Sequence, residues 1–183
     1  MPWKVMPMEL IEAIKTRRSI RSFKKDPVPD ELIKQIIEAG AFAPSSHNTQ
    51  PWEFIIIKDR TTIEKLSRTH EWSAHLKGAP VVIVACGNLK KRDHVFPCMV
   101  SVALAVENML LAINSLGLAT CWTYIHNPEL PQAEKNVKDT LGLPDHIIPL
   151  CMLPIGYPAS TQKNKKIVKT EKIIHYEKYS EKS

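Results

Sequence analysis

Apolar residues recur along the chain at spacings that alternate between helical and extended patterns. A proline followed by two acids, Pro29-Asp30-Glu31, is typical of a helix start, and Gly117 favours the end of the longest helical segment. Segment 71–78 fits neither period. The predicted order is helix 8–18, helix 29–42, strand 52–58, helix 61–68, strand 80–86, helix 97–116, strand 119–125, helix 131–141 and strand 147–155.

This order predicts an α+β fold in which helices surround a small sheet. Strand 80–86 is apolar on both faces, which is typical of an internal strand. Helix 97–116 carries one charged residue, Glu107, and is apolar nearly all round, so we expect it at the centre of the fold or of a dimer. No repeat or flexible linker interrupts the sequence. Residues 1–183 are therefore expected to form a single domain, with a charged C-terminal arm over about residues 159–183.

The composition is ordinary for a globular protein and excludes a disordered, collagen-like or coiled-coil chain. A chain of 183 residues can bury roughly 70 % of its surface, so a real core is available. The four cysteines are too few and too scattered for a disulfide scaffold. No export signal or membrane-spanning run stands out. We therefore expect a cytoplasmic protein with reduced thiols and no membrane association.

Positive charge is concentrated in two segments. The chain has 25 basic and 19 acidic residues, a net charge of +6. Residues 15–25 hold six basic residues and no acid, and residues 159–183 hold seven lysines and three glutamates. Such an excess favours anionic ligands or partners. Nucleic-acid binding is a remote alternative, because few aromatic residues are interleaved with these charges.

Several common chemistries are excluded by spacing. The sequence has no G-x-G-x-x-G dinucleotide fingerprint, no phosphate-binding loop with its lysine, no H-E-x-x-H and no G-x-S-x-G. The sequence has no C-x-x-C pair, and no two histidines lie at helical spacing on a predicted helix. We therefore expect no metal site and no hydrolase-type nucleophile.

The first candidate binding segment is R-R-S-I-R at 17–21. Arg17 and Arg21 are four positions apart, so on a helical turn both guanidinium groups face the same point, and Ser19 adds a hydroxyl group between them. Phosphate groups are bound by such planar, bidentate donors. The alternative is a solvated basic face that complements the end of a helix.

The second candidate is P-S-S-H-N-T-Q-P-W at 44–52. Two prolines stiffen this loop, and between them lie hydroxyl and amide side chains that both donate and accept hydrogen bonds. Such a set can bind the edge of a planar heterocycle or a polyol chain. The alternative is a polar surface loop that Trp52 anchors in the core.

Taken together, these motifs resemble the nitroreductase family of FMN-dependent NAD(P)H oxidoreductases. The resemblance covers about residues 8–176 and depends on the order of the pieces. They are R-R-S-I-R at 17–21, P-V-P at 27–29, A-P-S-S-x-N-x-Q-P-W at 43–52, A-P at 79–80, E-N-M-L-L-A at 107–112, G-L-A-T-C-W at 117–122 and L-P-I-G-Y-P at 153–158. It implies a mostly antiparallel central sheet flanked by helices, a long central dimer helix, and a homodimer with two FMN sites at its interface.

The resemblance also implies a set of site residues. Arg17 and Ser19 match positions that bind the FMN phosphate, Arg21 lies toward the ribityl chain and the pyrimidine edge, and residues 121–124 lie against the flavin near N5. The cofactor-binding residues implied are Arg17, Arg18, Ser19 and Arg21, then Pro44, Ser45, Ser46, Asn48 and Gln50 from the other subunit, and Cys121, Trp122, Thr123, Lys165 and Lys166. No catalytic side chain is implied, because the chemistry belongs to the flavin.

The implied reaction takes a hydride from NADH or NADPH onto flavin N5 and passes electrons to a small acceptor, such as a nitroaromatic or a quinone, by a ping-pong mechanism. Trp72, Trp122, Tyr124 and His126 either line the acceptor site or pack in the core. His47 is either a proton donor or an exposed bystander. The same flavin site could instead serve dehalogenation, substrate dehydrogenation or flavin breakdown.

One departure concerns a polar or lysine contact that larger members supply before the strand matching residues 80–86. Glu71, Ala74 and Lys77 all lie near that position, and none of them matches it well.

Overall fold

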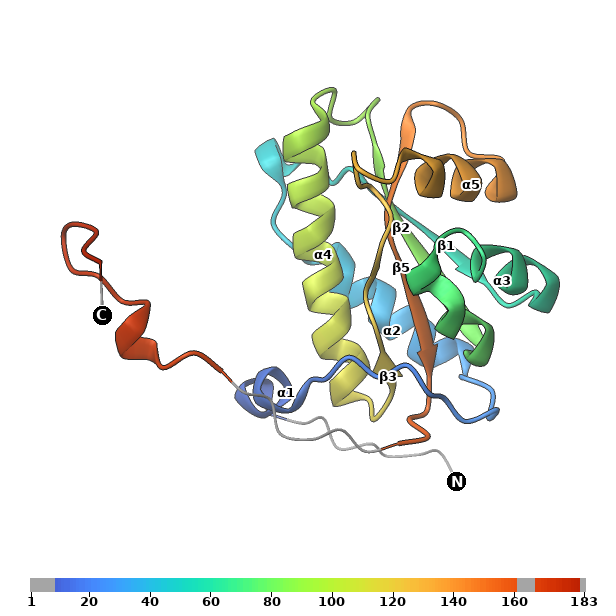
Figure 1. Ribbon diagram of the computed structural model, residues 1–183, viewed down its shortest axis with the longest axis horizontal. Coiled ribbons are helices and arrows are strands. Elements are labelled where there is room, and N and C mark those ends of the chain that lie inside the picture. Colours follow the sequence, from blue (N-terminus) through green and yellow to red (C-terminus); the bar gives the residue numbers. More distant parts are fainter. Residues whose placement is uncertain (1–8, 161–166, 182–183) are drawn as a thin grey trace.

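The computed structural model of the protein describes residues 9–160 and 167–181 (Figure 1). Its strands are β1 (Trp52–Ile57), β2 (Val81–Asn88), β3 (Ala119–Thr120), β4 (Thr123–Tyr124) and β5 (Ile147–Gly156). Its helices are α1 (Leu10–Thr16), α2 (Asp30–Ala41), α3 (Arg60–Leu66), α4 (Val95–Ser115) and α5 (Pro131–Leu141), with 3₁₀ turns η1 (Ser46–Asn48), η2 (Glu71–Gly78) and η3 (Thr170–Lys172).

The strands form one sheet in the order β1-β2-β5-β3, with β4 also paired to β5, and every strand pair is antiparallel. Helices α2 and α4 cover one face, and α3, η2 and α5 cover the other (Figure 1). Alternate residues of β2 supply the two cores: Val81, Ile83 and Ala85 pack toward α2 and α4, whereas the residues between them pack toward the opposite layer. The predicted α+β fold with an antiparallel sheet is confirmed.

Strand β5 carries the one register shift between β2 and β5. Ala85 pairs with Cys151 but Cys86 pairs with Pro149, so Leu150 is an extra residue on β5. Leu150 and Cys151 consequently both belong to the core beneath α4. A β-bulge accommodates a proline that cannot donate a backbone hydrogen bond.

The predicted strand 119–125 is wrong in detail, because the structure has two short strands there. Thr120 pairs with Ile155 and Thr123 pairs with Met152, so the same register would place Cys121 opposite Pro154. Proline has no N–H to donate to the ladder. The break therefore falls at Cys121 and Trp122.

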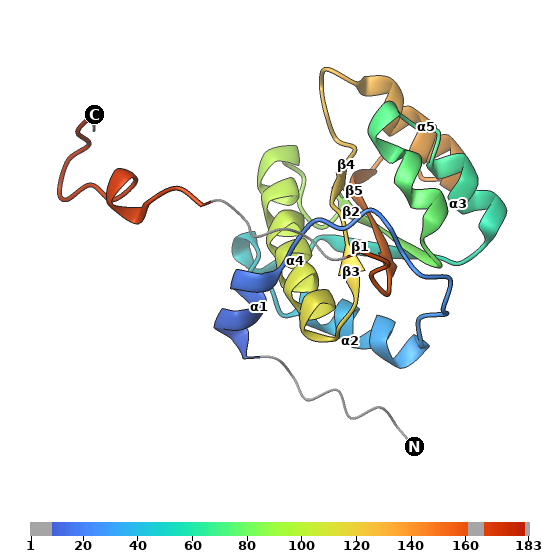
Figure 2. The same cartoon turned by 60° about the horizontal axis from the view of Figure 1, so that its bottom comes forward.

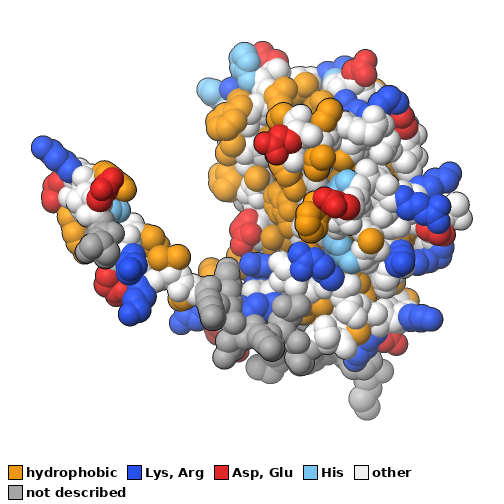
Figure 3. All heavy atoms as spheres, viewed as in Figure 1, with side chains coloured by type: hydrophobic (Ala, Val, Ile, Leu, Met, Phe, Trp, Pro, Cys, Tyr) orange, Lys and Arg blue, Asp and Glu red, His pale blue; other side chains and the backbone are white. Residues whose placement is uncertain are grey.

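Helix α4 is the central element. Its 21 residues have a mean hydropathy that would suit a membrane span by length and composition alone, although the sequence shows no uninterrupted apolar run of that length. Half of the apolar window is buried inside the fold, where α4 packs on α2 and on the sheet. The remaining apolar side chains, including Phe96, Val100 and Leu104, form a hydrophobic band along the exposed face of α4 (Figure 3).

The C-terminal segment 167–181 lies away from the rest of the protein in both ribbon views (Figures 1 and 2). It contains η3 and exposes apolar side chains such as Ile167, Ile173 and Tyr176. The side chains of Ile167, Ile173 and Tyr176 are each more than 60 % exposed.

Candidate functional site

The arginine-rich segment begins where α1 ends and continues along the edge of the sheet. The amide of Asn114 on α4 donates to the Ala13 carbonyl (3.0 Å) and to the Thr16 hydroxyl (2.9 Å), which fixes the end of α1. Ser19 forms a parallel bridge with Thr120, and the Ile20 N–H donates to the Thr120 carbonyl at 2.9 Å. The backbone of the segment is therefore held firmly beside β3.

The side chains of this segment divide into two roles. Arg18 donates to the carbonyl oxygens of Lys15 (2.7 Å) and Arg17 (2.9 Å), so it serves the C-terminal end of α1. Arg17 and Arg21 form no ion pair with any acidic side chain in the described residues. Two cations without acidic partners favour an anionic ligand.

Cys121 lies near these groups. Burial raises the pKa of the Cys121 thiol, while Arg21, a hydrogen bond from Ser19, and Arg17 act against that rise. The structure thus brings Arg17, Ser19, Arg21 and Cys121 close together. The hydroxyl oxygen of neighbouring Thr120 is buried and has no hydrogen-bond partner among the described residues.

An open cavity of about 670 Å³ adjoins this cluster. Arg21 lies at its wall, and Trp72 and Tyr124, both predicted as acceptor-site candidates, line it as well. The complete lining is Arg21, His70, Glu71, Trp72, Ala74, His75, Cys121, Trp122, Thr123, Tyr124, Asn127 and Leu130. His126 lies elsewhere: it lines a neighbouring cavity and is paired with Glu134 at 2.8 Å.

His75 is a cavity residue that the sequence analysis missed. Its Nε2 atom lies 3.2 Å from the hydroxyl oxygen of Thr123, which in turn donates to the Cys121 carbonyl (3.3 Å). Burial lowers the pKa of His75, and the positive charge of Arg21 lowers it further. Burial also lowers the pKa of His70. Both imidazoles are thereby favoured in their neutral form.

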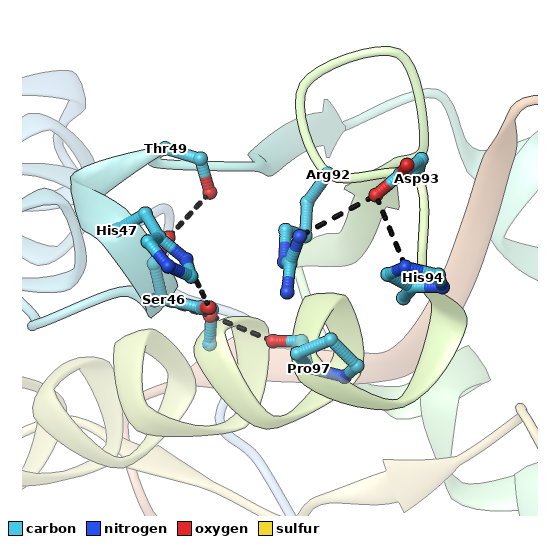
Figure 4. A network of polar contacts seen from close by, with 8 residues as sticks. Ser46, His47, Thr49, Arg92, Asp93, His94 and Pro97 are labelled. Carbon is cyan, nitrogen blue, oxygen red and sulfur yellow. Dashed lines mark hydrogen bonds and ion pairs between the residues drawn. The ribbon is translucent and has the colours of Figure 1, made fainter.

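The polar loop at 45–50 has an unusual backbone. His47, Asn48 and Gln50 have φ values of 53°, 54° and 45°, in the left-handed region that non-glycine residues seldom adopt. The Ser45 hydroxyl accepts from the Gln50 N–H (2.9 Å), and the Ser46 N–H donates to the Ser101 hydroxyl on α4 (3.2 Å). Figure 4 shows this loop against the first turns of α4. Strain of this kind is concentrated at binding and catalytic sites.

The two candidate segments lie at opposite ends of α4 (Figure 1). Ser46 contacts Ser101, whereas the end of α1 contacts Asn114, thirteen positions later. A helix rises 1.5 Å per residue, so the two anchor points are roughly 20 Å apart. One chain therefore does not present both segments to the same point.

Some of the remaining predicted residues are placed and others are not. Pro44 is exposed beside the loop, and the amide of Gln50 donates to the side chain of Asn48 at 3.1 Å. Thr123 is a buried residue of the cavity wall. Lys165 and Lys166 lie outside the described residues.

Comparison with known proteins gives the family. Residues 14–70 and 64–157 match the nitroreductase family. A protein of Methanothermobacter thermautotrophicus, provisionally named NADH dehydrogenase/NAD(P)H nitroreductase, is 36 % identical over 178 residues, which are 96 % of this chain and 91 % of that protein. The chain belongs to the nitroreductase family.

Solved structures agree with this assignment. A Parabacteroides distasonis protein with the same provisional name has a TM-score of 0.87 at 35 % identity and covers 93 % of this chain and 98 % of its own. A nitroreductase-like protein of Desulfovibrio desulfuricans, solved in complex with FMN, has a TM-score of 0.82 at 27 % identity and covers 94 % and 99 %. The predicted family and fold are confirmed, and the names of these relatives bear out the predicted enzyme class and cofactors.

A relative with another activity is also similar. Iodotyrosine deiodinase 1 of Rattus norvegicus is 31 % identical over 189 residues, which cover 85 % of this chain and 64 % of that protein.

Proposed function

We propose that the protein is an FMN-dependent oxidoreductase that transfers electrons from NADH or NADPH to a small acceptor. The observation that carries this proposal is the pair of cations, Arg17 and Arg21, beside an open cavity at the sheet edge. Family membership supports it, because relatives are named for NAD(P)H-dependent reduction and one is solved with FMN.

The residues present fit FMN. Arg17 and Ser19 offer a guanidinium and a hydroxyl to the phosphate, and charge-assisted hydrogen bonds of this kind contribute about 1.5–3 kcal/mol each. The polar atoms of Ser45, Ser46 and Asn48 offer the mixed donors and acceptors that a ribityl chain or a pyrimidine edge needs. Arg18 contributes through the backbone it stabilises, because its own guanidinium faces the end of α1.

We further propose that each FMN site is shared between two chains of a homodimer. The separation of about 20 Å along α4 prevents one chain from supplying both segments. The hydrophobic band on α4, where Phe96 is 80 % and Leu104 is 44 % exposed, would be buried between the subunits (Figure 3). The apolar side chains of segment 167–181 would pack against the partner subunit.

Bound FMN would supply the redox chemistry, by accepting a hydride from the nicotinamide and passing the electrons on. Arg21 places a positive charge at the cavity wall, where it would stabilise negative charge on a reduced cofactor. His75, favoured as the neutral imidazole, adds no second charge and holds Thr123 through its hydrogen bond. Because one open cavity serves donor and acceptor, we expect them to bind in turn, with ping-pong kinetics and no side-chain acid or base.

A second candidate is reductive dehalogenation at the same site, which the similarity to iodotyrosine deiodinase supports. Release of iodide from an iodinated tyrosine by the reduced enzyme would favour it over quinone or nitroarene reduction. Both candidates use the same cofactor and the same two-chain site, and both fit the predicted cytoplasmic location.

The test is the visible spectrum of the purified protein, followed by anaerobic titration with NADH and with NADPH. We expect a flavin spectrum with about one FMN per chain and bleaching by at least one of the two nucleotides. A protein that binds no FMN when supplied with it, or FMN that neither nucleotide bleaches, would contradict the proposal.

A further inference from the structure

A third cation lies beside the polar loop, and the proposed function has no use for it. Arg92 follows β2 and precedes α4, and its backbone N–H donates to the Asn88 carbonyl at 3.2 Å. Its guanidinium points into the space between the loop carrying Ser46 and His47 and the first turns of α4 (Figure 4). Burial raises the pKa of the Cys98 thiol in the first turn of α4, and the charge of Arg92 acts against that rise.

The polar atoms of Arg92 are poorly satisfied. The side chain is only 21 % exposed, and its Nε atom is buried with no hydrogen-bond partner among the described residues. Its ion pair is a long contact of 3.4 Å between Nη1 and Asp93 Oδ1, and the Asp93 side chain is 77 % exposed. By contrast, neighbouring Lys91 pairs with Glu53 at 2.9 Å. A partly buried guanidinium with an unpaired donor favours a ligand that brings its own negative charge.

We propose that Arg92 binds an anionic group, a carboxylate or a phosphate, of the substrate that occupies the flavin site. This inference rests on the proposed function, which assigns the loop at 45–50 to a cofactor held mainly by the partner subunit. The FMN phosphate is already assigned there to Arg17 and Ser19, so Arg92, which lies beside the loop, serves a different anion. The substrate class is therefore an acceptor or nucleotide with negatively charged oxygens.

Two sources of this anion are distinguishable. An acceptor would present a carboxylate, whereas NADPH would present its 2′-phosphate, which NADH lacks. The first source predicts selectivity between acceptors, and the second predicts selectivity between nucleotides.

The test uses the FMN-loaded protein and Arg92→Gln, with Lys90→Gln as a matched control two positions earlier on the exposed surface. The ratio of kcat/KM for 4-nitrobenzoate to that for 4-nitrobenzamide is measured, and so is the ratio for NADPH to NADH. We expect one of the two ratios to fall about tenfold or more in Arg92→Gln, the loss typical of a charge-assisted hydrogen bond, and neither to change in Lys90→Gln. The affected ratio in Arg92→Lys should lie between those of wild type and Arg92→Gln, because lysine keeps the positive charge but not the planar, bidentate hydrogen bonding of arginine.

A second readout does not depend on turnover. Binding of benzoate, or of 2′,5′-ADP for the nucleotide source, is followed by the change that it causes in the flavin absorbance, and we expect Arg92→Gln to weaken one of them. Thermal unfolding shows whether the variant is folded. Loss of FMN from folded Arg92→Gln would overturn the inference, because Arg92 would then belong to the cofactor site. Equal losses for charged and neutral partners, or no change beyond that of Lys90→Gln, would overturn it as well. A failure of the proposed function would be recognised separately, because the wild-type protein would then bind no FMN.

Discussion

Arg17, Arg18 and Arg21 are chemically alike and lie within five residues, yet their surroundings separate their roles. Arg18 turns back to carbonyl oxygens at the end of α1, as a basic residue at a helix C-terminus commonly does. Arg17 and Arg21 instead lie near Cys121, at the edge of the cavity. The sequence predicts all three as binding residues, but only the fold shows that the Arg18 guanidinium is engaged by carbonyl oxygens at the end of α1.

Arg17→Ala should therefore remove FMN. Loss of a charge-assisted contact costs about 1.5–3 kcal/mol, or roughly ten- to hundredfold in affinity for FMN. The measurement is the ratio of flavin to protein absorbance after gel filtration, with Lys25→Ala as the control from the same basic segment. Stoichiometric FMN in folded Arg17→Ala would assign the phosphate to other residues.

His75 should make stability depend on pH. Burial lowers its pKa in the folded protein, so between that value and its ordinary value near 6.5 the unfolded chain binds more protons. The free energy of unfolding should consequently fall as the pH drops through and below 6.5. His75→Gln, which keeps a hydrogen-bonding group for Thr123, should reduce this slope. Urea unfolding between pH 8 and pH 5 measures it, with exposed His94→Gln as the control; an unchanged slope in His75→Gln would contradict the assignment.

At the level of elements, periodicity identified the regular helices and strands and failed where the backbone is irregular. Helix α5 has the predicted bounds, because its amphipathic pattern and the leading Pro131 are local features. The break between β3 and β4 arises opposite Pro154, more than thirty residues later, so local pattern could not reveal it. Segment 71–78 is a 3₁₀ turn without the period of a helix or a strand.

The site shows the same division. The motif at 17–21 and the loop at 45–50 are visible in sequence because their residue types are unusual in such close spacing. Arg92 and His75 could not be singled out, because their importance depends on what packs around them. The run Lys90-Lys91-Arg92 was the only local signal for Arg92, and it does not distinguish the partly buried member from its exposed neighbours.

The crossing of α2 and α4 depends on Gly40. A Cβ atom at this position would lie 2.8 Å from Met109 Cγ and 3.3 Å from the Ala105 carbonyl oxygen, and Met109 is fully buried. Overpacking of this kind costs about 1–3 kcal/mol. Alanine offsets up to about 1 kcal/mol of that cost, because it favours the helix more than glycine does. Gly40→Ala should therefore lower the free energy of unfolding.

Gly78→Ala is the matched control for Gly40→Ala, because its Cβ would meet nothing closer than Phe23 Cδ2 at 4.0 Å. We expect little change there. Urea unfolding of both variants measures the difference, and equal stabilities would show that α2 and α4 separate at no cost.

At the scale of the whole molecule, the distance between the two binding segments is the decisive feature. The end of α1 meets Asn114 and the polar loop meets Ser101, so in the proposed dimer each chain would supply two half-sites that face different places. The exposed apolar band on α4, from Val95 to Leu104, lies in the N-terminal half of the helix, around Ser101 (Figure 3). Pairing of two chains through this band would complete two sites at once.

Mixing two defective proteins tests this arrangement. Ser46→Ala and Arg17→Ala should each lose FMN, because each substitution removes a contact in a different half of the proposed site. After subunit exchange, the mixed dimer contains one site with both halves intact, so about half of the normal flavin of that dimer should return. Flavin absorbance measures the recovery, and mass spectrometry of the intact dimer verifies the exchange. No recovery after verified exchange would contradict a shared site.

The placement of half-sites at the two ends of α4 has a consequence for how the protein behaves on dilution. In the proposed dimer, FMN binds only where two chains meet, and bound FMN in turn joins the two chains. Mass action therefore links FMN binding to dimerisation. Excess FMN would keep the dimer assembled at protein concentrations where the apoprotein dissociates. Dilution alone would release FMN from the enzyme. An apparent affinity for FMN would then change with the amount of protein in the cuvette.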